Sequence, residues 1–273
     1  MDEPSPGTLR VPGAALHYET RGDGPLLLMI PGGSGVAEPF DGMAERLAAQ
    51  FTVAVLEPRG APRSPLDAPD AEQSPEEHAD DALRLLDLLS PDAPASVFGS
   101  SSGAITALAL TARRPDRVRR TVAHEPPVVE VLPDAERHRR MFDEVHRAFK
   151  SGGVEAAVGV MAEGFDAPAE APARAPGPEA MARMHAGMPF FLDRIVPRFT
   201  RFVPDTGALR ASGRLVPAHG EATRGRLPAR PAERLGDLVG HPAAEFPGGH
   251  LGYTSHPEDF AEALLSLLPP ETG

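Results

Sequence analysis

The chain has no cysteine, few aromatic residues (5% of 273) and no long apolar run. Without cysteine, disulfide bridges, thiolate metal sites and a cysteine nucleophile are excluded. The longest apolar runs, such as LLLMI at 26–30, are far too short to span a bilayer. The opening MDEPSPGTLR lacks the basic start and apolar stretch of a signal peptide. We therefore expect a soluble cytoplasmic protein that has no membrane partner.

Positive charge is also scarce. Lys and Arg number 27 against 39 Asp and Glu, which gives a formal net charge of −12 at pH 7. Nucleic acids and anionic membrane surfaces are bound through clustered positive charge. The arginine-rich stretch at 113–120 is surrounded by acidic runs and is typical of a solvated surface. We therefore expect no nucleic-acid partner, and we expect highly anionic substrates to be disfavoured.

Short apolar segments alternate with helical patterns in the first half of the chain. The apolar segments, typical of strands buried on both faces, are 25–30, 52–58 and 95–99. The helical patterns follow them at 40–51, 74–90 and 104–114. Such alternation predicts an α/β fold with a mostly parallel central sheet and helices on both of its faces.

The alternation stops at about residue 128 and returns after about 204. Between these points the patterns are helical without strands, and a proline-rich stretch covers 166–180. We expect a core domain formed by 1–127 and 204–273, with residues 128–203 inserted as a helical cap. Ser255 and Glu258 form the pattern of a capping box for a final helix.

The expected cap is rich in flexible and aromatic apolar residues, with five of the 8 Met and 7 of the 12 Phe of the chain. Short helices need such side chains to dock on a core, and an adaptable substrate pocket needs them too. The sequence does not separate these explanations. Met188, Phe190 and Phe191 are our first candidates for substrate-binding residues.

The stretch GSSSG at 99–103 lies between an apolar strand pattern and an alanine-rich helix pattern. It fits G-x-S-x-G with Ser101 in the middle. In a sharp strand-to-helix turn this motif exposes one hydroxyl above the sheet edge. The alternative interpretation is an ordinary helix N-cap. The context favours Ser101 as a nucleophile.

A serine hydroxyl needs a base, and the base needs a carboxylate to fix its tautomer. His250 follows EFPGG and is expected on a loop at the carboxyl edge of the sheet, where Ser101 also emerges. His78 and most other histidines fall in patterns typical of structural roles. Glu125 and Glu221 both follow strands and both satisfy the order serine, acid, histidine. The residues alone do not decide which of these two glutamates is the catalytic acid.

The oxyanion formed during acyl transfer needs two N–H donors that are already in place. We expect the backbone amide of Ser102 to be one of them, because it directly follows the nucleophile. The second is expected from the PGGSG loop after the strand at 25–30, with Gly33 as the candidate. A plain tight turn is the alternative explanation of that loop.

With these residues placed, the chain resembles the α/β-hydrolase superfamily over nearly its whole length. The segments LHYETRGDGPLLLMIPGG, FGSSSG, RRPDRVRRTVAHEPP and FPGGHLGYTSHPEDF occur in family order. Within the superfamily they are most similar to the lactonases that open the macrolide ring of zearalenone. That resemblance implies Glu125 as the acid, in its HE-P setting. Glu221 stands where many other α/β-hydrolases have theirs.

We therefore expect a serine hydrolase that cleaves a carboxylic ester or lactone, with an apolar small molecule as substrate and no metal or organic cofactor. Thioesterase, C–C hydrolase and perhydrolase activities use the same triad and remain open. Epoxide hydrolases and haloalkane dehalogenases of this fold have aspartate at the position of Ser101. The alternative from a different functional class is a ligand receptor that has no catalytic activity. The oligomeric state, a homodimer included, stays open.

Overall fold

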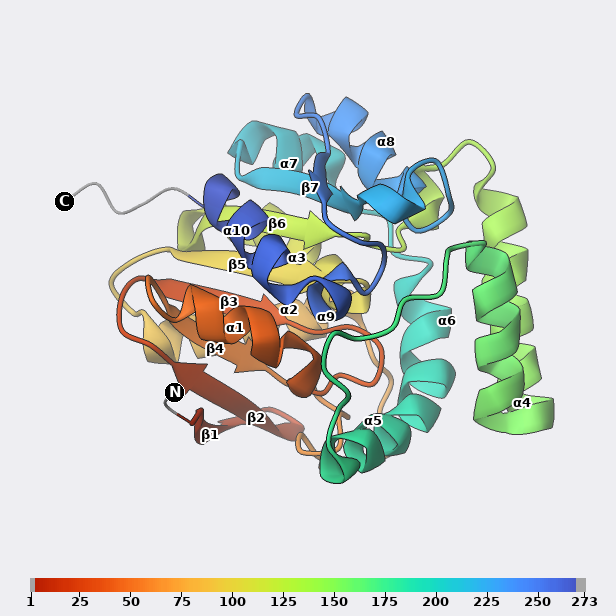
Figure 1. The fold of residues 1–273 in the computed structure, drawn as a ribbon, viewed down its shortest axis with the longest axis horizontal. Coiled ribbons are helices and arrows are strands. Elements are labelled where there is room, and N and C mark those ends of the chain that lie inside the picture. Colours follow the sequence, from red (N-terminus) through yellow and green to blue (C-terminus); the bar gives the residue numbers. More distant parts are fainter. Residues whose placement is uncertain (1–2, 269–273) are drawn as a thin grey trace.

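The computed structural model describes residues 3–268, and its centre is an eight-stranded sheet (Figure 1). The strand order is β1-β2-β4-β3-β5-β6-β7-β8. The β1–β2 and β2–β4 pairs are antiparallel, and the remaining pairs are parallel, so the mostly parallel sheet is confirmed. The strands are β1 (Ser5–Val11), β2 (Ala14–Arg21), β3 (Leu26–Ile30), β4 (Thr52–Leu56), β5 (Ala95–Ser100), β6 (Val118–His124), β7 (Leu215–Gly220) and β8 (Ala244–Phe246).

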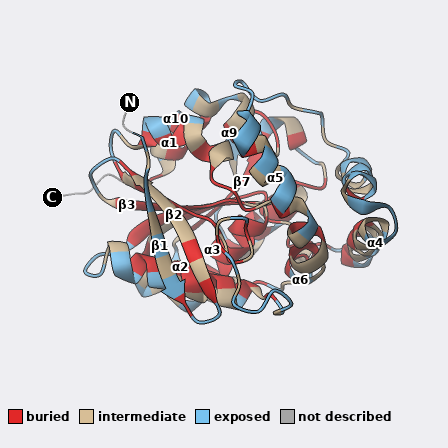
Figure 2. Cartoon of the chain, turned by 90° about the horizontal axis from the view of Figure 1, so that it is seen from below, coloured by how far each residue is buried: buried red, intermediate tan, exposed pale blue. Residues whose placement is uncertain are grey.

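Helices cover both faces of the sheet, as the alternation predicts (Figures 1 and 2). One face carries α1 (Asp41–Leu47), α9 (Gly252–Ser255) and α10 (Pro257–Leu267). The other carries α2 (Pro75–Leu89), α3 (Ser102–Arg113), α7 (Thr206–Ser212) and α8 (Arg230–Val239). Figure 2 shows the buried residues concentrated on the strands between these two layers.

Strand β3 shows why an unbroken apolar run forms a strand here. All five of its residues are buried, and successive side chains point to opposite faces. Leu27 and Met29 join the core beneath α1 and α10, whereas Leu28 and Ile30 join the core beneath α2 and α3. Each fully buried side chain of this kind contributes about 2 kcal/mol relative to exposure.

A helical insertion follows β6 and precedes β7. It contains α4 (Ala135–Phe165), α5 (Pro178–Phe190), a π-helical turn (Phe191–Ile195) and α6 (Val196–Phe199). Helix α4 breaks at Gly153, whose φ of 77° is outside helical values. Its two arms fold back on each other, with the rings of Phe142 and Phe165 at 6.3 Å between centroids. Figure 1 shows the two arms of α4 side by side.

The prediction of a capping box for the last helix is wrong. Helix α10 starts at Pro257, its N-cap is His256, and no side chain caps it. A proline favours the first position of a helix, so α10 begins one residue too late for Ser255 to cap it. The Ser255 hydroxyl instead donates to Glu170, on the proline-rich segment of the insertion.

None of the helices within residues 3–268 is both long and apolar enough to cross a membrane.

Candidate active site

Ser101 lies at the turn between β5 and α3, in a strained backbone conformation with φ 54° and ψ −123°. Such a conformation costs a non-glycine residue about 1–3 kcal/mol. The Ser101 N–H donates to the carbonyl of His124 at 2.9 Å, which ties the turn to β6. The Ser101 side chain does not cap α3. The hydroxyl of Ser101 is therefore not used in capping the helix.

The two glycines of the motif allow the strand and helix backbones to approach each other. A Cβ atom on Gly103 would lie 2.1 Å from the carbonyl oxygen of Ile30. A Cβ atom on Gly99 would lie 2.5 Å from the carbonyl oxygen of Gly103. Real side chains do not tolerate such distances, so the sharp turn at Ser101 depends on both glycines.

We expect Gly103→Ala to destabilise the fold by about 3 kcal/mol or more, because the methyl group overpacks a fully buried backbone contact. Gly159→Ala is the matched control, since Gly159 lies in α4 with no atom within 4 Å of its missing Cβ. The control is expected to gain about 0.5–1 kcal/mol from helix propensity. Urea unfolding midpoints measure both, and equal midpoints would contradict the packing argument.

Glu125 and His250 form a buried pair close to this turn. Glu125 directly follows β6, has a positive φ of 47° and is 1% exposed. Its Oε2 lies 2.7 Å from Nδ1 of His250. Its Oε1 accepts from the Gly220 N–H at 2.9 Å and from the Thr223 hydroxyl. Both carboxylate oxygens therefore take part in hydrogen bonds, and Oε2 is the one that contacts the imidazole.

Burial raises the pKa of Glu125, but the hydrogen bond with His250 and the neighbouring histidine charges outweigh it, so that the pKa falls to about 2. The carboxylate is therefore ionised at neutral pH. An ionised carboxylate fixes the proton of His250 on Nδ1 and leaves Nε2 with the lone pair that a general base needs.

Glu221, the other candidate acid, is exposed in the short helix Glu221–Thr223. Within the part of the chain that the structure describes, it makes no hydrogen bond to His250. The structure thus brings Glu125 to the histidine and leaves Glu221 at the surface.

No hydrogen bond joins the Ser101 hydroxyl to the His250 ring within the described residues. Such contacts are often long in the absence of substrate and shorten when it binds. The two residues follow β5 and β8 of the same sheet, at its carboxyl edge.

The two expected oxyanion donors lie beside the elbow. Ser102 is the first residue of α3, where a backbone N–H has no partner within the helix. Neither it nor the Gly33 N–H donates to a protein acceptor among residues 3–268. Gly33 has a φ of +58°, and no atom lies within 4 Å of its missing Cβ. The adjacent Gly32 contacts the elbow itself, because its Cβ would lie 2.7 Å from that of Ser101.

The family model for the alpha/beta hydrolase fold matches residues 25–184, which is more than half of the chain. The chain belongs to this family. An uncharacterized hydrolase, YraK, of Bacillus subtilis strain 168 is 32% identical over 97% of this chain and 96% of its own length. A zearalenone hydrolase of Bionectria ochroleuca is 29% identical, with 93% of each chain covered. The protein is therefore an α/β-fold hydrolase, similar to the zearalenone hydrolases.

Solved structures agree on the fold. A hydrolase from Pseudomonas aeruginosa matches with a TM-score of 0.74 at 21% identity, covering 96% of this chain and 97% of its own. The carboxylesterase CesB of Bacillus subtilis matches with a TM-score of 0.71 at 19% identity, covering 97% and 92%. These similarities extend over the sheet and the helical insertion together.

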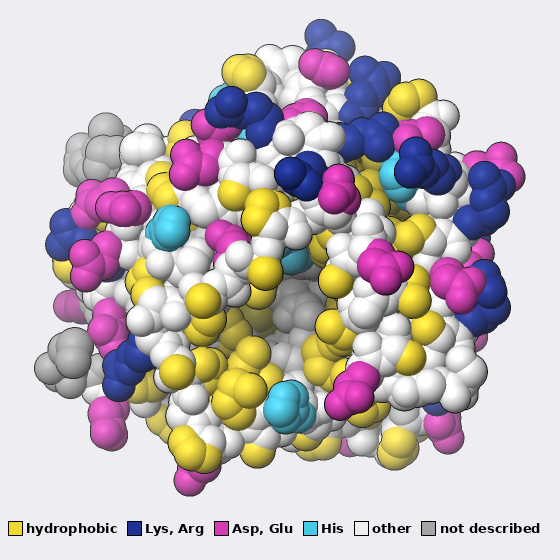
Figure 3. All heavy atoms as spheres, turned by 45° about the vertical axis from the view of Figure 1, so that its right-hand side comes forward, with side chains coloured by type: hydrophobic (Ala, Val, Ile, Leu, Met, Phe, Trp, Pro, Cys, Tyr) yellow, Lys and Arg dark blue, Asp and Glu magenta, His cyan; other side chains and the backbone are white. Residues whose placement is uncertain are grey.

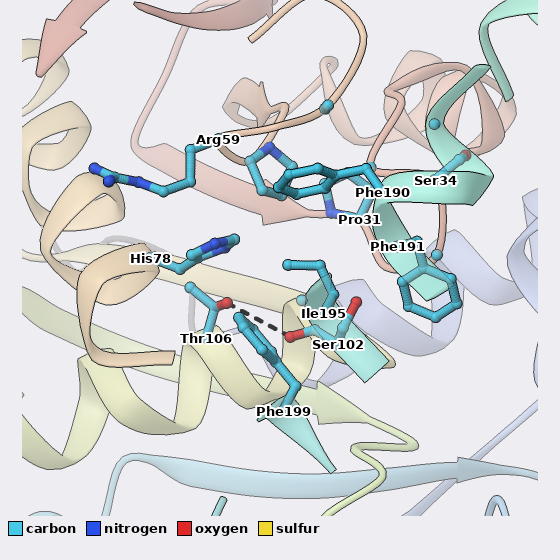
Figure 4. Close-up of a pocket in the computed structure, with 16 residues that line it drawn as sticks. Pro31, Ser34, Arg59, His78, Ser102, Thr106, Phe190, Phe191, Ile195 and Phe199 are labelled. Carbon is cyan, nitrogen blue, oxygen red and sulfur yellow. Dashed lines mark hydrogen bonds between the residues drawn. The ribbon is translucent and has the colours of Figure 1, made fainter. Parts of the chain in front are cut away.

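A pocket of this hydrolase adjoins the elbow on the side of Gly33 and Ser102. Ser101 and His250 are not among its lining residues. Figure 3 shows the side of the molecule that carries the insertion, where a hollow is bordered mostly by hydrophobic side chains. The insertion lines the pocket with Gly187, Phe190, Phe191, Ile195 and Phe199 (Figure 4).

Two of the three expected substrate-binding residues line the pocket. Phe190 lies against Gly60, whose Cβ would be 2.1 Å from the phenylalanine ring, and Phe191 lies beside it. Met188 does not line this pocket and packs against the hydrophobic cluster that joins the insertion to the core domain. Successive residues of a helix are rotated by about 100°. Gly187 and Phe190 are three residues apart and share one side of α5, whereas Met188 lies on a different side.

His78 lines the pocket from the core, although its sequence pattern suggested a structural role. Its Nε2 lies 3.0 Å from the Gln73 side-chain oxygen, and the Gln73 amide nitrogen donates to a backbone carbonyl. Burial lowers the pKa of His78 to about 3, so the ring is neutral. In the sequence, His78 is separated from Ala82 and Leu85 by helical spacing, and both of these residues are buried. This pattern could have predicted that His78 faces inward.

Arg59 and Thr106 also line the pocket and were missed from the sequence. The Arg59 guanidinium points away from the pocket (Figure 4) and binds Asp81 through two hydrogen bonds of 2.6 and 2.7 Å. Thr106 lies one helical turn after Ser102 and donates to its carbonyl at 3.5 Å. The described residues include no group of His, Cys, Asp or Glu arranged to hold a metal ion.

Proposed function

We propose that this hydrolase cleaves a carboxylic ester or lactone of an apolar small molecule, with Ser101, His250 and Glu125 as a catalytic triad. The observation that carries the proposal is the 2.7 Å contact between His250 Nδ1 and the buried Glu125 carboxylate, at the sheet edge where Ser101 follows β5. The similarity to zearalenone hydrolases supports a lactone or ester as substrate class.

In the first half of the reaction, the Ser101 oxygen attacks the substrate carbonyl while Nε2 of His250 takes the hydroxyl proton. Glu125 stabilises the imidazolium that forms. The unpaired N–H groups of Gly33 and Ser102 stabilise the oxyanion. His250 then gives the proton to the departing alcohol oxygen, and an acyl-enzyme on Ser101 remains.

In the second half, His250 takes a proton from a water molecule that attacks the acyl-enzyme. A second oxyanion forms at the same two amides. Its collapse returns the proton to Ser101 and releases the carboxylic acid. With a lactone, acid and alcohol leave as one opened molecule.

We take residues 128–203 as the cap of this active site. Its phenylalanines supply apolar walls beside the oxyanion donors, which suits an arm of the substrate that has little charge. Neutral His78 and the Thr106 hydroxyl supply the polar groups of the same pocket. A small neutral ester or lactone is therefore the proposed partner.

A fluorophosphonate tests the proposal, because it phosphonylates only a serine that a base has activated. We expect a single adduct on Ser101 in the full-length protein, located by mass spectrometry of peptides. In His250→Ala the adduct is expected to disappear, because the base is gone. The same preparation is screened for turnover of neutral esters and lactones.

A folded wild-type protein that forms no adduct would refute the proposal. The favoured function would then be that of a ligand receptor that has the hydrolase fold but no catalytic activity. An adduct on a serine other than Ser101 would refute the assignment of the nucleophile.

A further inference from the structure

We infer that Glu170, on the proline-rich segment of the insertion, is a positioning residue that holds the backbone on both sides of the catalytic base His250. The inference rests on the proposed function, in which His250 is the base. Glu170 touches neither Ser101 nor the His250 ring through a hydrogen bond among the described residues. It acts through the loop that carries the base.

The contacts of Glu170 are specific to that loop. Its Oε1 accepts from the Gly249 N–H at 2.7 Å, and its Oε2 accepts from the Leu251 N–H at 3.1 Å. One carboxylate thereby binds the amides immediately before and after His250. The Ser255 hydroxyl, at the end of α9, donates to the same Oε1 at 3.1 Å.

The glycines before His250 make room for this carboxylate. A Cβ atom on Gly248 would lie 2.7 Å from Oε1 of Glu170, and one on Gly249 would lie 3.1 Å from Oε2. Gly248 also has a φ of +76°. Two successive glycines make a loop that has many conformations available. The loop therefore needs contacts from outside to keep the imidazole in one place.

Residues close to Glu170 in the chain contact the loop as well. The Phe165 ring lies edge-on to the His250 ring, with 5.4 Å between centroids and an interplanar angle of 71°. The Ala173 N–H donates to the Thr254 carbonyl at 2.8 Å. Residues 165–173, which we call the brace segment, thus contact the histidine ring, the backbone beside it and the short helix that follows.

The consequence for catalysis follows from geometry. Glu125 fixes one edge of the imidazole, but a single hydrogen bond leaves the ring free to move with its loop. A displacement of about 1 Å in a catalytic group can cost about 10²-fold in rate. We therefore expect the loss of the Glu170 contacts to reduce kcat about tenfold, with KM changed less than twofold.

Glu170→Gln is the test variant, because it keeps the size of the side chain and replaces one acceptor oxygen by an amide donor. That NH₂ group would face a backbone N–H that is also a donor. Glu163→Gln is the matched control: it removes the same charge from an exposed position in α4, seven residues before. Glu170→Asp retains the charge and is expected to recover part of the lost kcat.

The first measurement is amide hydrogen exchange of full-length protein, read on peptides within 247–256. We expect the Gly249 and Leu251 amides to exchange slowly in the wild type and in Glu163→Gln, and at least tenfold faster in Glu170→Gln. Rapid exchange of both amides in the wild type would overturn the inference, whatever the variants do. This readout does not depend on any enzymatic activity.

The second measurement is kcat and KM on an ester that the wild type hydrolyses, with the concentration of active sites titrated by fluorophosphonate. A tenfold lower kcat with unchanged KM and full titration supports the positioning role. A kcat equal to that of Glu163→Gln overturns it. If the wild type itself forms no adduct, the proposed function fails, while the exchange measurement still decides whether Glu170 holds the loop.

Discussion

Replacing Ser101 by alanine is expected to reduce ester or lactone turnover by about four to six orders of magnitude, because the nucleophile and its covalent intermediate are both lost. The oxyanion donors and the pocket remain in Ser101→Ala, so substrate binding is expected to persist. Turnover is measured with the best substrate from the screen. Binding is measured separately by calorimetry.

The fold is expected to survive this substitution. Alanine keeps the Cβ atom that packs against Gly32, and no hydrogen bond of the Ser101 side chain is lost among the described residues. The thermal midpoint is expected to stay within a few degrees of the wild type. His250→Ala should lose turnover to a similar degree, because the two residues act as a unit. Activity equal to the wild type in either variant would refute the mechanism.

Glu125→Gln is expected to lower turnover by about 10⁴-fold, because the amide no longer fixes the tautomer of His250 or stabilises its positive charge. Glu221→Gln removes the same charge at the surface and is expected to change turnover less than twofold. The two variants are purified and assayed side by side with one substrate. A larger loss in Glu221→Gln would assign the acid to the surface position.

The pH dependence of stability provides a second signature of Glu125. Its pKa falls from the usual 4.5 to about 2 in the folded chain. A lowered pKa means that the unfolded state binds the proton more tightly, so this contribution to stability is complete above pH 4.5 and disappears towards pH 2. The unfolding free energy of the wild type should therefore fall more steeply over this range than that of Glu125→Gln.

The sequence predicted the parts of the site that depend on local pattern. GSSSG between an apolar strand and a helix located Ser101, because the sharp turn imposes glycine at both ends of the motif. The position of His250 followed from the rule that the carboxyl ends of parallel strands share one edge. The choice between Glu125 and Glu221 needed three-dimensional structure or a resemblance, because both glutamates directly follow strands at that edge.

Residues that act across long stretches of chain were not predictable in this way. Glu170 lies in the proline-rich segment at 166–180, whose pattern is typical of an extended loop, and its partners are about 80 residues further on. Ser255 was assigned to a helix cap because its local pattern fits one, yet its hydroxyl donates to Glu170. In both cases a tertiary hydrogen bond decides the role, and no local periodicity encodes it.

The order of the strands also sets the order in which the parts of the candidate site are synthesised. Ser101 and Glu125 directly follow the adjacent strands β5 and β6, which the ribosome makes within the first half of the chain. His250 comes after β8, the edge strand that pairs with β7, and both strands follow the helical insertion. A nascent chain therefore contains Ser101 and Glu125 without His250 until translation has passed the insertion and β8. A chain released before that point lacks His250, and under the proposed mechanism it would not hydrolyse esters.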